Sequence, residues 1–153
     1  MNDQGAEKVK FTVYCLGYGG LIPFILTLAG IYFGNHAISA YSVVAFISYA
    51  SVILGFVGAV HWGFILKSDL AQRQGLLLSI SVLPGLIGWL ALISPLPIAL
   101  IILTIAYPLV LIYERLSELN VLLPDWYSSM RVILTISVTT MLLVSFVPVV
   151  LLA

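Results

Sequence analysis

The sequence predicts an all-α integral membrane protein, a bundle of five transmembrane helices that forms one domain over residues 1–153. Hydrophobic residues make up 62% of the chain and charged residues 8%, and the mean hydropathy is +1.19. A soluble domain carries about 25% charged residues, so the solvent around this chain must be largely lipid. The apolar stretches are long and unbroken, which favours helices over the ten-residue alternation of outer-membrane strands.

Each of the five apolar stretches is close to or above the length of about 20 helical residues that crosses a bilayer core. The predicted spans cover residues 11–34, 41–66, 75–94, 96–113 and 132–153. Pro23 and Pro84 lie inside the first and third spans, and Pro108 predicts a kink in the fourth. Pro95 and Pro97 predict an extended hairpin before the fourth span, because proline disfavours helix in the residue before it.

The first span is predicted to be retained as a membrane helix. Its apolar run of about 24 residues is longer than the 7 to 15 residues of a signal-peptide core. Asp3 and Glu7 precede it, and a mitochondrial transit peptide is poor in acids. We therefore predict a bacterial inner (plasma) membrane, with the mitochondrial inner membrane as the alternative.

The distribution of lysine and arginine predicts the orientation. The six basic residues lie before the first span, between the second and third, and around the loop between the fourth and fifth: Lys8, Lys10, Lys67, Arg73, Arg115 and Arg131. The other three loops and ends carry none. Short loops rich in these residues stay in the cytoplasm, so the N-terminus is predicted to be cytoplasmic and the C-terminus periplasmic.

Composition and motifs exclude several function classes. The net charge is zero, which argues against nucleic acid as a partner. The single Cys15, expected to be a small buried hydrophobe, forms no internal disulfide. No catalytic residues and no cofactor are predicted, because the chain lacks the GxSxG, HExxH and P-loop signatures. This favours a protein that is not an enzyme.

Small residues recur every four positions in the second span, at Ser51, Gly55, Ala59 and Gly63. Side chains four apart lie on one side of a helix, and small ones let a second helix approach closely. Trp62 shares a flank with Gly55, Gly58 and Ala59. The pattern predicts a helix-packing face, with a groove for a quinone or a lipid tail as the alternative.

A polar cluster is predicted at the cytoplasmic side. His61 precedes Lys67 by six residues, about 9 Å along a helix. Glu114 and Arg131 lie at the same depth, so we predict that they pair, with His61 lining the same inner-leaflet pocket. The alternatives are that both charges snorkel separately to the headgroups and that His61 makes one structural hydrogen bond.

Further polar side chains share helical faces with this cluster. Tyr107 lies seven residues before Glu114, and Thr135 and Thr139 follow Arg131 at four-residue steps. No metal site is predicted, because His36 is expected on the opposite side of the membrane from His61.

Three stretches of the sequence resemble one family. They are LGYGGLIPF (16–24), YASVILGFVGAVHWG (49–63) and LPDWYSSMRVILT (123–135). Together they are similar to the transmembrane protein 69 family, known as domain of unknown function 3429. The resemblance implies a small multi-pass membrane protein, bacterial or mitochondrial, without an established activity. It singles out these positions: Gly17, Gly20, Pro23, His61, Trp62, Gly63, Trp126, Tyr127 and Arg131.

The function predicted from these features is that of a non-enzymatic structural or accessory membrane protein. Its partners would be membrane lipids, with quinone or another membrane protein as further candidates. Trp126 and Tyr127 are placed like an interfacial aromatic pair. The alternative is a small transporter or proton conductor that uses His61, Glu114 and Arg131. A water-filled path through His61 would favour transport, and a dry bundle with a lipid-facing groove would favour the accessory function.

Overall fold

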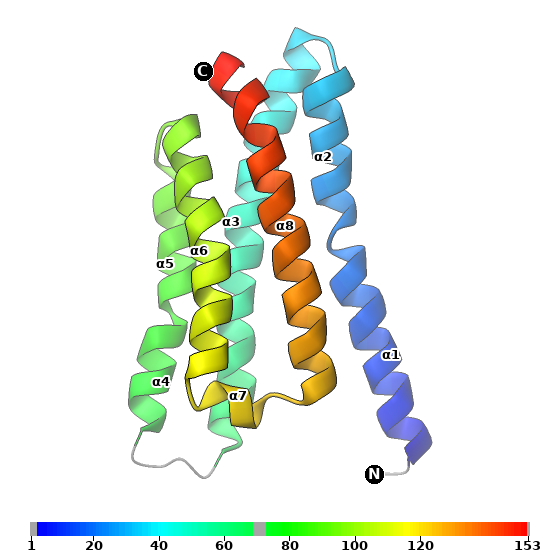
Figure 1. Ribbon diagram of the computed structural model, residues 1–153, viewed down its shortest axis with the longest axis vertical. Coiled ribbons are helices and arrows are strands. Elements are labelled where there is room, and N and C mark those ends of the chain that lie inside the picture. Colours follow the sequence, from blue (N-terminus) through cyan, green and yellow to red (C-terminus); the bar gives the residue numbers. More distant parts are fainter. Residues whose placement is uncertain (1–2, 69–72, 153) are drawn as a thin grey trace.

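The computed structural model describes residues 3–68 and 73–152, and every regular element in these ranges is a helix (Figure 1). The helices are α1 (Asp3–Gly19), α2 (Ile22–Phe33), α3 (His36–Leu66), α4 (Gln74–Ser81), α5 (Leu83–Leu92), α6 (Leu96–Leu116), α7 (Leu119–Leu122) and α8 (Asp125–Leu152). Five helical stretches are long and apolar enough to cross a membrane: Glu7–Phe33, His36–Leu66, Gln74–Leu92, Leu96–Leu116 and Asp125–Leu151. The predicted all-α class with five membrane-length helices is confirmed.

Helices α3 and α8 begin well before the spans that hydropathy alone predicts, as does α1, which begins at Asp3. The side chain of Asn35 accepts a hydrogen bond from Ile38 N at 3.0 Å, so it caps the N-terminus of α3. The uncharged segment before residue 41 is therefore this cap and the first turn of α3. The last helix starts at Asp125, whose carboxylate suits the positive end of a helix dipole, and not at residue 132.

The first and third membrane stretches are each built from two consecutive helices. α1 ends at Gly19 and α2 begins at Ile22, while α4 and α5 meet at Val82. Pro23 and Pro84 each lie in the first turn of the following helix, where a missing N–H leaves no hydrogen bond unmade. Pro108 instead lies inside the continuous helix α6.

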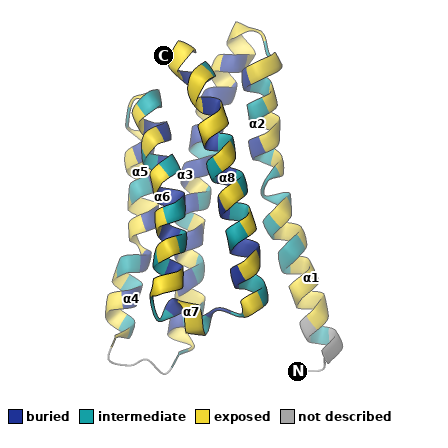
Figure 2. Cartoon of the chain, in the orientation of Figure 1, coloured by how far each residue is buried: buried dark blue, intermediate teal, exposed yellow. Residues whose placement is uncertain are grey.

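Helix α3 lies at the centre of the bundle, packed against α2, α5 and α6 (Figure 1). Helix α1 leans away from the bundle at the N-terminal end and packs mainly against α8. Most of α1 is therefore exposed, whereas α3 carries a continuous buried stripe (Figure 2). Cys15 on α1 is exposed, so the expectation of a buried cysteine is wrong.

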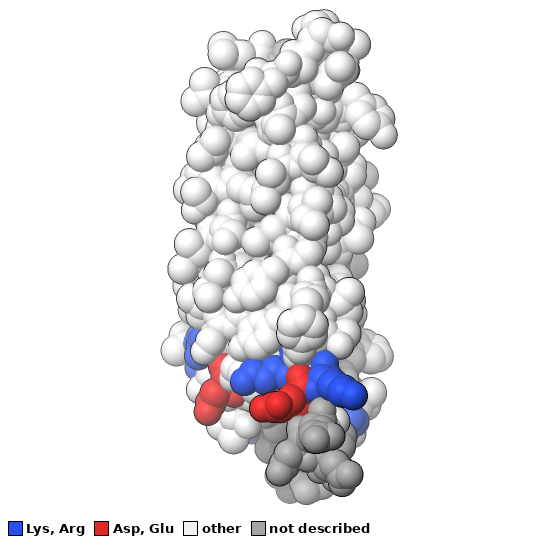
Figure 3. Space-filling view, turned by 90° about the vertical axis from the view of Figure 1, so that its right-hand side faces the viewer, with Lys and Arg blue, Asp and Glu red and all other residues white. Residues whose placement is uncertain are grey.

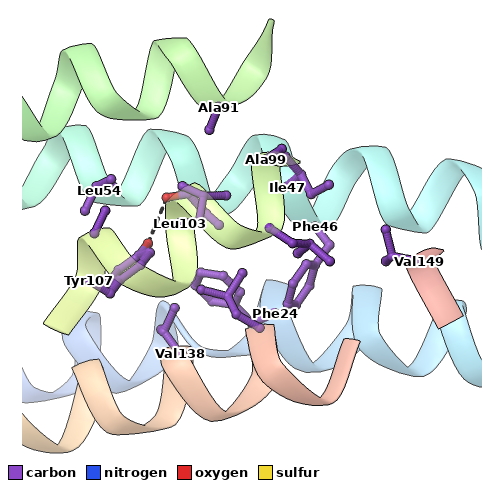
Figure 4. Packing of buried hydrophobic residues seen from close by; sticks show 14 of the residues in the cluster. Phe24, Phe46, Ile47, Leu54, Ala91, Ala99, Leu103, Tyr107, Val138 and Val149 are labelled. Atoms are coloured by element: carbon purple, nitrogen blue, oxygen red, sulfur yellow. Dashed lines mark hydrogen bonds between the residues drawn. The ribbon is translucent and has the colours of Figure 1, made fainter. Parts of the chain in front are cut away.

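The buried core brings together side chains from α2, α3, α6 and α8 (Figure 4). The Phe24 and Phe46 rings meet edge to face, with centroids 5.6 Å apart. The Tyr107 hydroxyl on α6 donates a hydrogen bond to Ala50 O on α3 at 2.8 Å. Lipid tails are as apolar as leucine, so close packing and such interhelical hydrogen bonds hold membrane helices together.

Small residues let α3 and α5 approach backbone to backbone. A Cβ built at Gly88 would lie 2.6 Å from Ser51 O, and one at Gly55 would lie 3.4 Å from Gly85 Cα. A Cβ at Gly58 would collide with Ser81 O and contact Pro84. The predicted close-packing face is therefore present at three of its positions, Ser51, Gly55 and Gly58.

The prediction that this face continues to Ala59 and Gly63 is wrong. Ala59 is exposed, and nothing lies within 4 Å of a Cβ built at Gly63. Trp62 is 43% exposed, so it does not cover the packing face. The reason is geometric: a helix has 3.6 residues per turn, so a strict four-residue spacing rotates by about 40° per step, and by the second step, at Ala59, the row has left the interface.

On the face shown in Figure 3, the charged side chains gather at one end of the molecule, and uncharged residues cover the remaining length. The start of α1, the end of α3, the start of α4 and α7 all lie at this end (Figure 1).

We expect this end to face the cytoplasm. An alkaline phosphatase fused after Ala153 should then be active in the periplasm, and one inserted in the loop 67–74 should be inactive. The reverse pattern would contradict the predicted orientation.

Candidate functional site

Three helices bring His61, Glu114 and Arg131 into one buried cluster at the charged end of the bundle. The side chains come from α3, α6 and α8, and the three residues are 1%, 2% and 5% exposed. His61 Nε2 lies 2.8 Å from Glu114 Oε1. Arg131 donates from Nη2 to Oε1 at 3.0 Å and from Nε to Oε1 and Oε2 at 3.3 and 3.4 Å.

The cluster is arranged so that its charges cancel. Glu114 accepts from both partners, and because His61 Nε2 faces a carboxylate oxygen, that nitrogen carries the proton and donates it. A buried ion is tolerated in a membrane protein when it is paired. The three predicted residues are thus in contact, and separate snorkelling of Glu114 and Arg131 does not occur in this structure.

His61 keeps one nitrogen without a partner. Its Nδ1 is buried and makes no hydrogen bond with the residues that the structure describes. His61 thus makes one hydrogen bond with the described residues, and its partner is the carboxylate of Glu114. Over the same described residues, no group of three or more His, Cys, Asp or Glu side chains is placed to hold a metal ion.

Beside this cluster lies a cleft of about 660 Å³ between α1, α3 and α8. Its wall is almost entirely apolar; representative side chains are Val13, Leu16, Val57, Val60, Leu134 and Val138. Helix α1 leans away from α3 and α8 (Figure 1), which leaves room for the cleft between them. The lining residues on α8 run from Trp126, near the start of that helix, to Val138, near its middle.

Polar groups interrupt the apolar wall at Arg131, Thr135 and Tyr107, and Trp126 and Tyr127 add an indole N–H and a phenol hydroxyl at its charged end. The Tyr107 hydroxyl is already committed to Ala50 O. Thr135 is 3% exposed, and its Oγ1 makes no hydrogen bond with any described residue. The four-residue spacing of Arg131 and Thr135 was the sequence signal for this pair, but nothing in the sequence indicated the cleft.

Trp126 and Tyr127 lie at the charged end of the cleft and line it. Their rings meet edge to face, with centroids 6.0 Å apart. Tyr14 on α1 reaches across and donates a hydrogen bond to Trp126 O at 3.3 Å, and Lys10 Nζ lies 6.0 Å from the Trp126 ring centre. This position suits an interfacial aromatic pair and ties α1 to α8.

The groove predicted on α3 lies on a different face from the cleft. Gly55 and Gly58 are covered by α5, and Ala59, Trp62 and Gly63 are exposed. The face of α3 that lines the cleft carries larger residues, among them Val57 and Val60. Small residues of the second span thus serve helix packing, whereas the cleft lies between α1, α8 and another face of α3.

A bundle with five membrane-length helices, closed around a buried Arg–Glu–His cluster, defines a multi-pass α-helical membrane protein. More specifically, the chain belongs to the family described as Protein of unknown function (DUF3429), which matches residues 9–147. The predicted family resemblance is confirmed.

A relative supports the same assignment. The chain is 30% identical over 129 residues to Transmembrane protein 69 of Xenopus tropicalis. The match covers 79% of this chain and 48% of the relative, so the chain spans about half the length of that protein. No solved structure matches significantly. The stretches 16–24, 49–63 and 123–135, which carry the resemblance, contribute most of the cleft wall.

Proposed function

We propose that this protein is a non-enzymatic accessory protein of the inner membrane that holds the apolar chain of a lipid or quinone in the cleft between α1, α3 and α8. The observation that carries the proposal is the cleft itself, about 660 Å³ with an almost wholly apolar wall. Small-molecule sites in proteins span about 300–1,000 Å³ and are mostly apolar, with a few placed polar groups. Arg131 and Thr135 supply such groups here.

The size of the cleft favours a chain over a transmembrane helix of another protein. A helix about 10 Å wide with a pitch of 5.4 Å fills roughly 400 Å³ per turn. The cleft of about 660 Å³ therefore has room for fewer than two turns, far short of a membrane span. A flexible hydrocarbon or isoprenoid chain needs no such width.

Transport through the polar cluster is the second candidate, supported by the buried contact between His61 and Glu114 and by the unbonded His61 Nδ1. The packing of the core away from the cluster gives the transport hypothesis less support. Phe24, Leu103 and Leu142 are among the apolar side chains that fill the core between the cluster and the opposite end. A core filled with apolar side chains favours binding over conduction.

Filling the cleft should reduce the binding of an apolar chain. Val60→Trp adds a bulky ring to the cleft wall on α3, whereas Val52→Trp places the same ring on an exposed face of α3. With a diazirine-bearing alkyl probe in nanodiscs, we expect cross-links to the cleft-lining Met130, Leu134 and Val138 in the wild type. We expect Val60→Trp to reduce them several-fold and Val52→Trp to leave them unchanged.

Peptide mass spectrometry would give the sites and the yields of these cross-links. Equal labelling of Met130, Leu134 and Val138 in the wild type and both variants would contradict occupation of the cleft, because the probe would then be reacting from bulk lipid.

A further inference from the structure

We propose that the cleft selects a quinone, whose head group accepts a hydrogen bond from the Thr135 hydroxyl while its apolar tail occupies the cleft. This inference rests on the proposed function and names the ligand for the same site. It is carried by three properties of the cleft wall: an unpartnered buried hydroxyl, a neutral balance of charge around it, and its depth in the membrane.

The Thr135 hydroxyl lacks the partner that Thr12 and Thr27 find in their own helices. Thr12 Oγ1 donates to Lys8 O at 2.9 Å, and Thr27 Oγ1 donates to Pro23 O at 2.6 Å. A threonine in a helix commonly donates its hydroxyl in this way to a main-chain carbonyl of the preceding turn. Thr135 lines the cleft but makes no such bond with the described residues, and its Oγ1 is buried beneath the surface of the cleft wall. A turn about χ1, for which a helical threonine has two favoured rotamers, would present this hydroxyl to an acceptor supplied by a ligand.

A second donor lies one turn away on the same face of α8. Arg131 also lines the cleft, and residues four apart share a helical face. Its hydrogen bonds within the described chain use Nε and Nη2, all to Glu114, and leave Nη1 without one. Two donors side by side suit a group that only accepts hydrogen bonds, as quinone carbonyls do.

The charge around Thr135 favours a neutral ligand. The positive charge of Arg131 is already cancelled by the carboxylate of Glu114 at 3.0 Å. An anionic head group at Thr135 would add an uncompensated charge inside an apolar cleft, which is costly in the membrane. A quinone carbonyl brings an acceptor without a charge.

The depth of Thr135 separates a quinone from a phospholipid. Thr135 follows the interfacial Trp126 by nine residues, which is ~13 Å along the helix. That places the hydroxyl near the middle of a hydrocarbon core about 30 Å thick. The ester carbonyls of a phospholipid remain beside its charged head group at the interface, whereas an uncharged quinone head can enter to this depth.

The test compares two ligands with the same tail, a quinone with a ten-carbon chain and decylbenzene, by the rise in melting temperature that each produces in nanodiscs. We expect the quinone to bind about tenfold more tightly to the wild type. Thr135→Val, which removes the hydroxyl and keeps the shape, should weaken quinone binding about five- to tenfold, the contribution of one hydrogen bond. It should leave decylbenzene binding unchanged.

Thr139→Val is the matched control, because Thr139 Oγ1 is also buried without a partner among the described residues but does not line the cleft. It should change neither affinity. Equal binding of the two ligands, or a quinone affinity unaffected by Thr135→Val, would overturn the quinone assignment and leave the apolar-chain function standing. A short-chain phosphatidylglycerol whose binding depends on Thr135 would also overturn it. Failure of both ten-carbon ligands to bind would overturn the proposed function itself.

Discussion

Glu114→Gln should destabilise the protein by about 3–5 kcal/mol, because it leaves Arg131 buried without its counter-charge. Arg131 is 5% exposed, and all of its hydrogen bonds to described residues go to Glu114. Glu114 also holds His61 at 2.8 Å, so the same substitution loosens the contact between α3 and α6. The free energy of unfolding, measured by titration with sodium dodecyl sulfate in mixed micelles, would show the loss.

A double-mutant cycle separates pairing from general damage. Arg131→Met removes the charge and retains an apolar stem, so the variant with both substitutions should be more stable than Glu114→Gln alone. Glu118→Gln is the matched control, because Glu118 pairs with an Arg73 side chain that is 72% exposed. Exposed pairs contribute about 0–1 kcal/mol. Strictly additive effects of Glu114→Gln and Arg131→Met would show that the two residues do not depend on each other.

Enlarging a glycine at the contact between α3 and α5 should also destabilise the protein. A Cβ at Gly88 would lie 2.6 Å from Ser51 O, a main-chain atom that moves only if a whole helix moves. Gly88→Ala should therefore cost about 1–3 kcal/mol, as overpacking does, and Gly88→Leu should cost more. Thermal unfolding in nanodiscs would measure both.

Gly63→Ala is the control for this prediction. Gly63 also lies within a helix, but a Cβ at this position would meet nothing within 4 Å. Alanine is the better helix former by about 1 kcal/mol, so this substitution should be neutral or slightly stabilising. If Gly63→Ala were as damaging as Gly88→Ala, the helix contact would not be the cause of the loss.

The cluster and the cleft share one residue, which links fold to function. Arg131 is held by Glu114 on α6 and at the same time lines the cleft. The ion pair therefore fixes the side chain that lies one turn from Thr135, so that in the proposed site this donor would be in place before a ligand arrives. In this arrangement a residue that pairs a buried charge also lines the proposed binding site.

The polar cluster was predictable because a single physical rule governs it. Glu114 and Arg131 each lie at the end of an apolar stretch at one side of the membrane, and an unpaired charge there is costly. Pairing follows from that cost, whatever the details of packing. The same reasoning covers the five apolar helices, because backbone groups in lipid must be satisfied within each segment.

What only the tertiary structure decided is which faces of the helices meet. The regular spacing of Gly55, Ala59 and Gly63 indicated one face, but α5 packs where Gly55 and Gly58 lie. The cleft depends on the outward lean of α1, which no local pattern encodes. The hydropathy and charge pattern of the sequence determined the lipid environment, the five helices and the end that carries the charges. It could not determine which helix faces contact each other. Lipid and helix surfaces are equally apolar, so these contacts depend on shape and on hydrogen bonds.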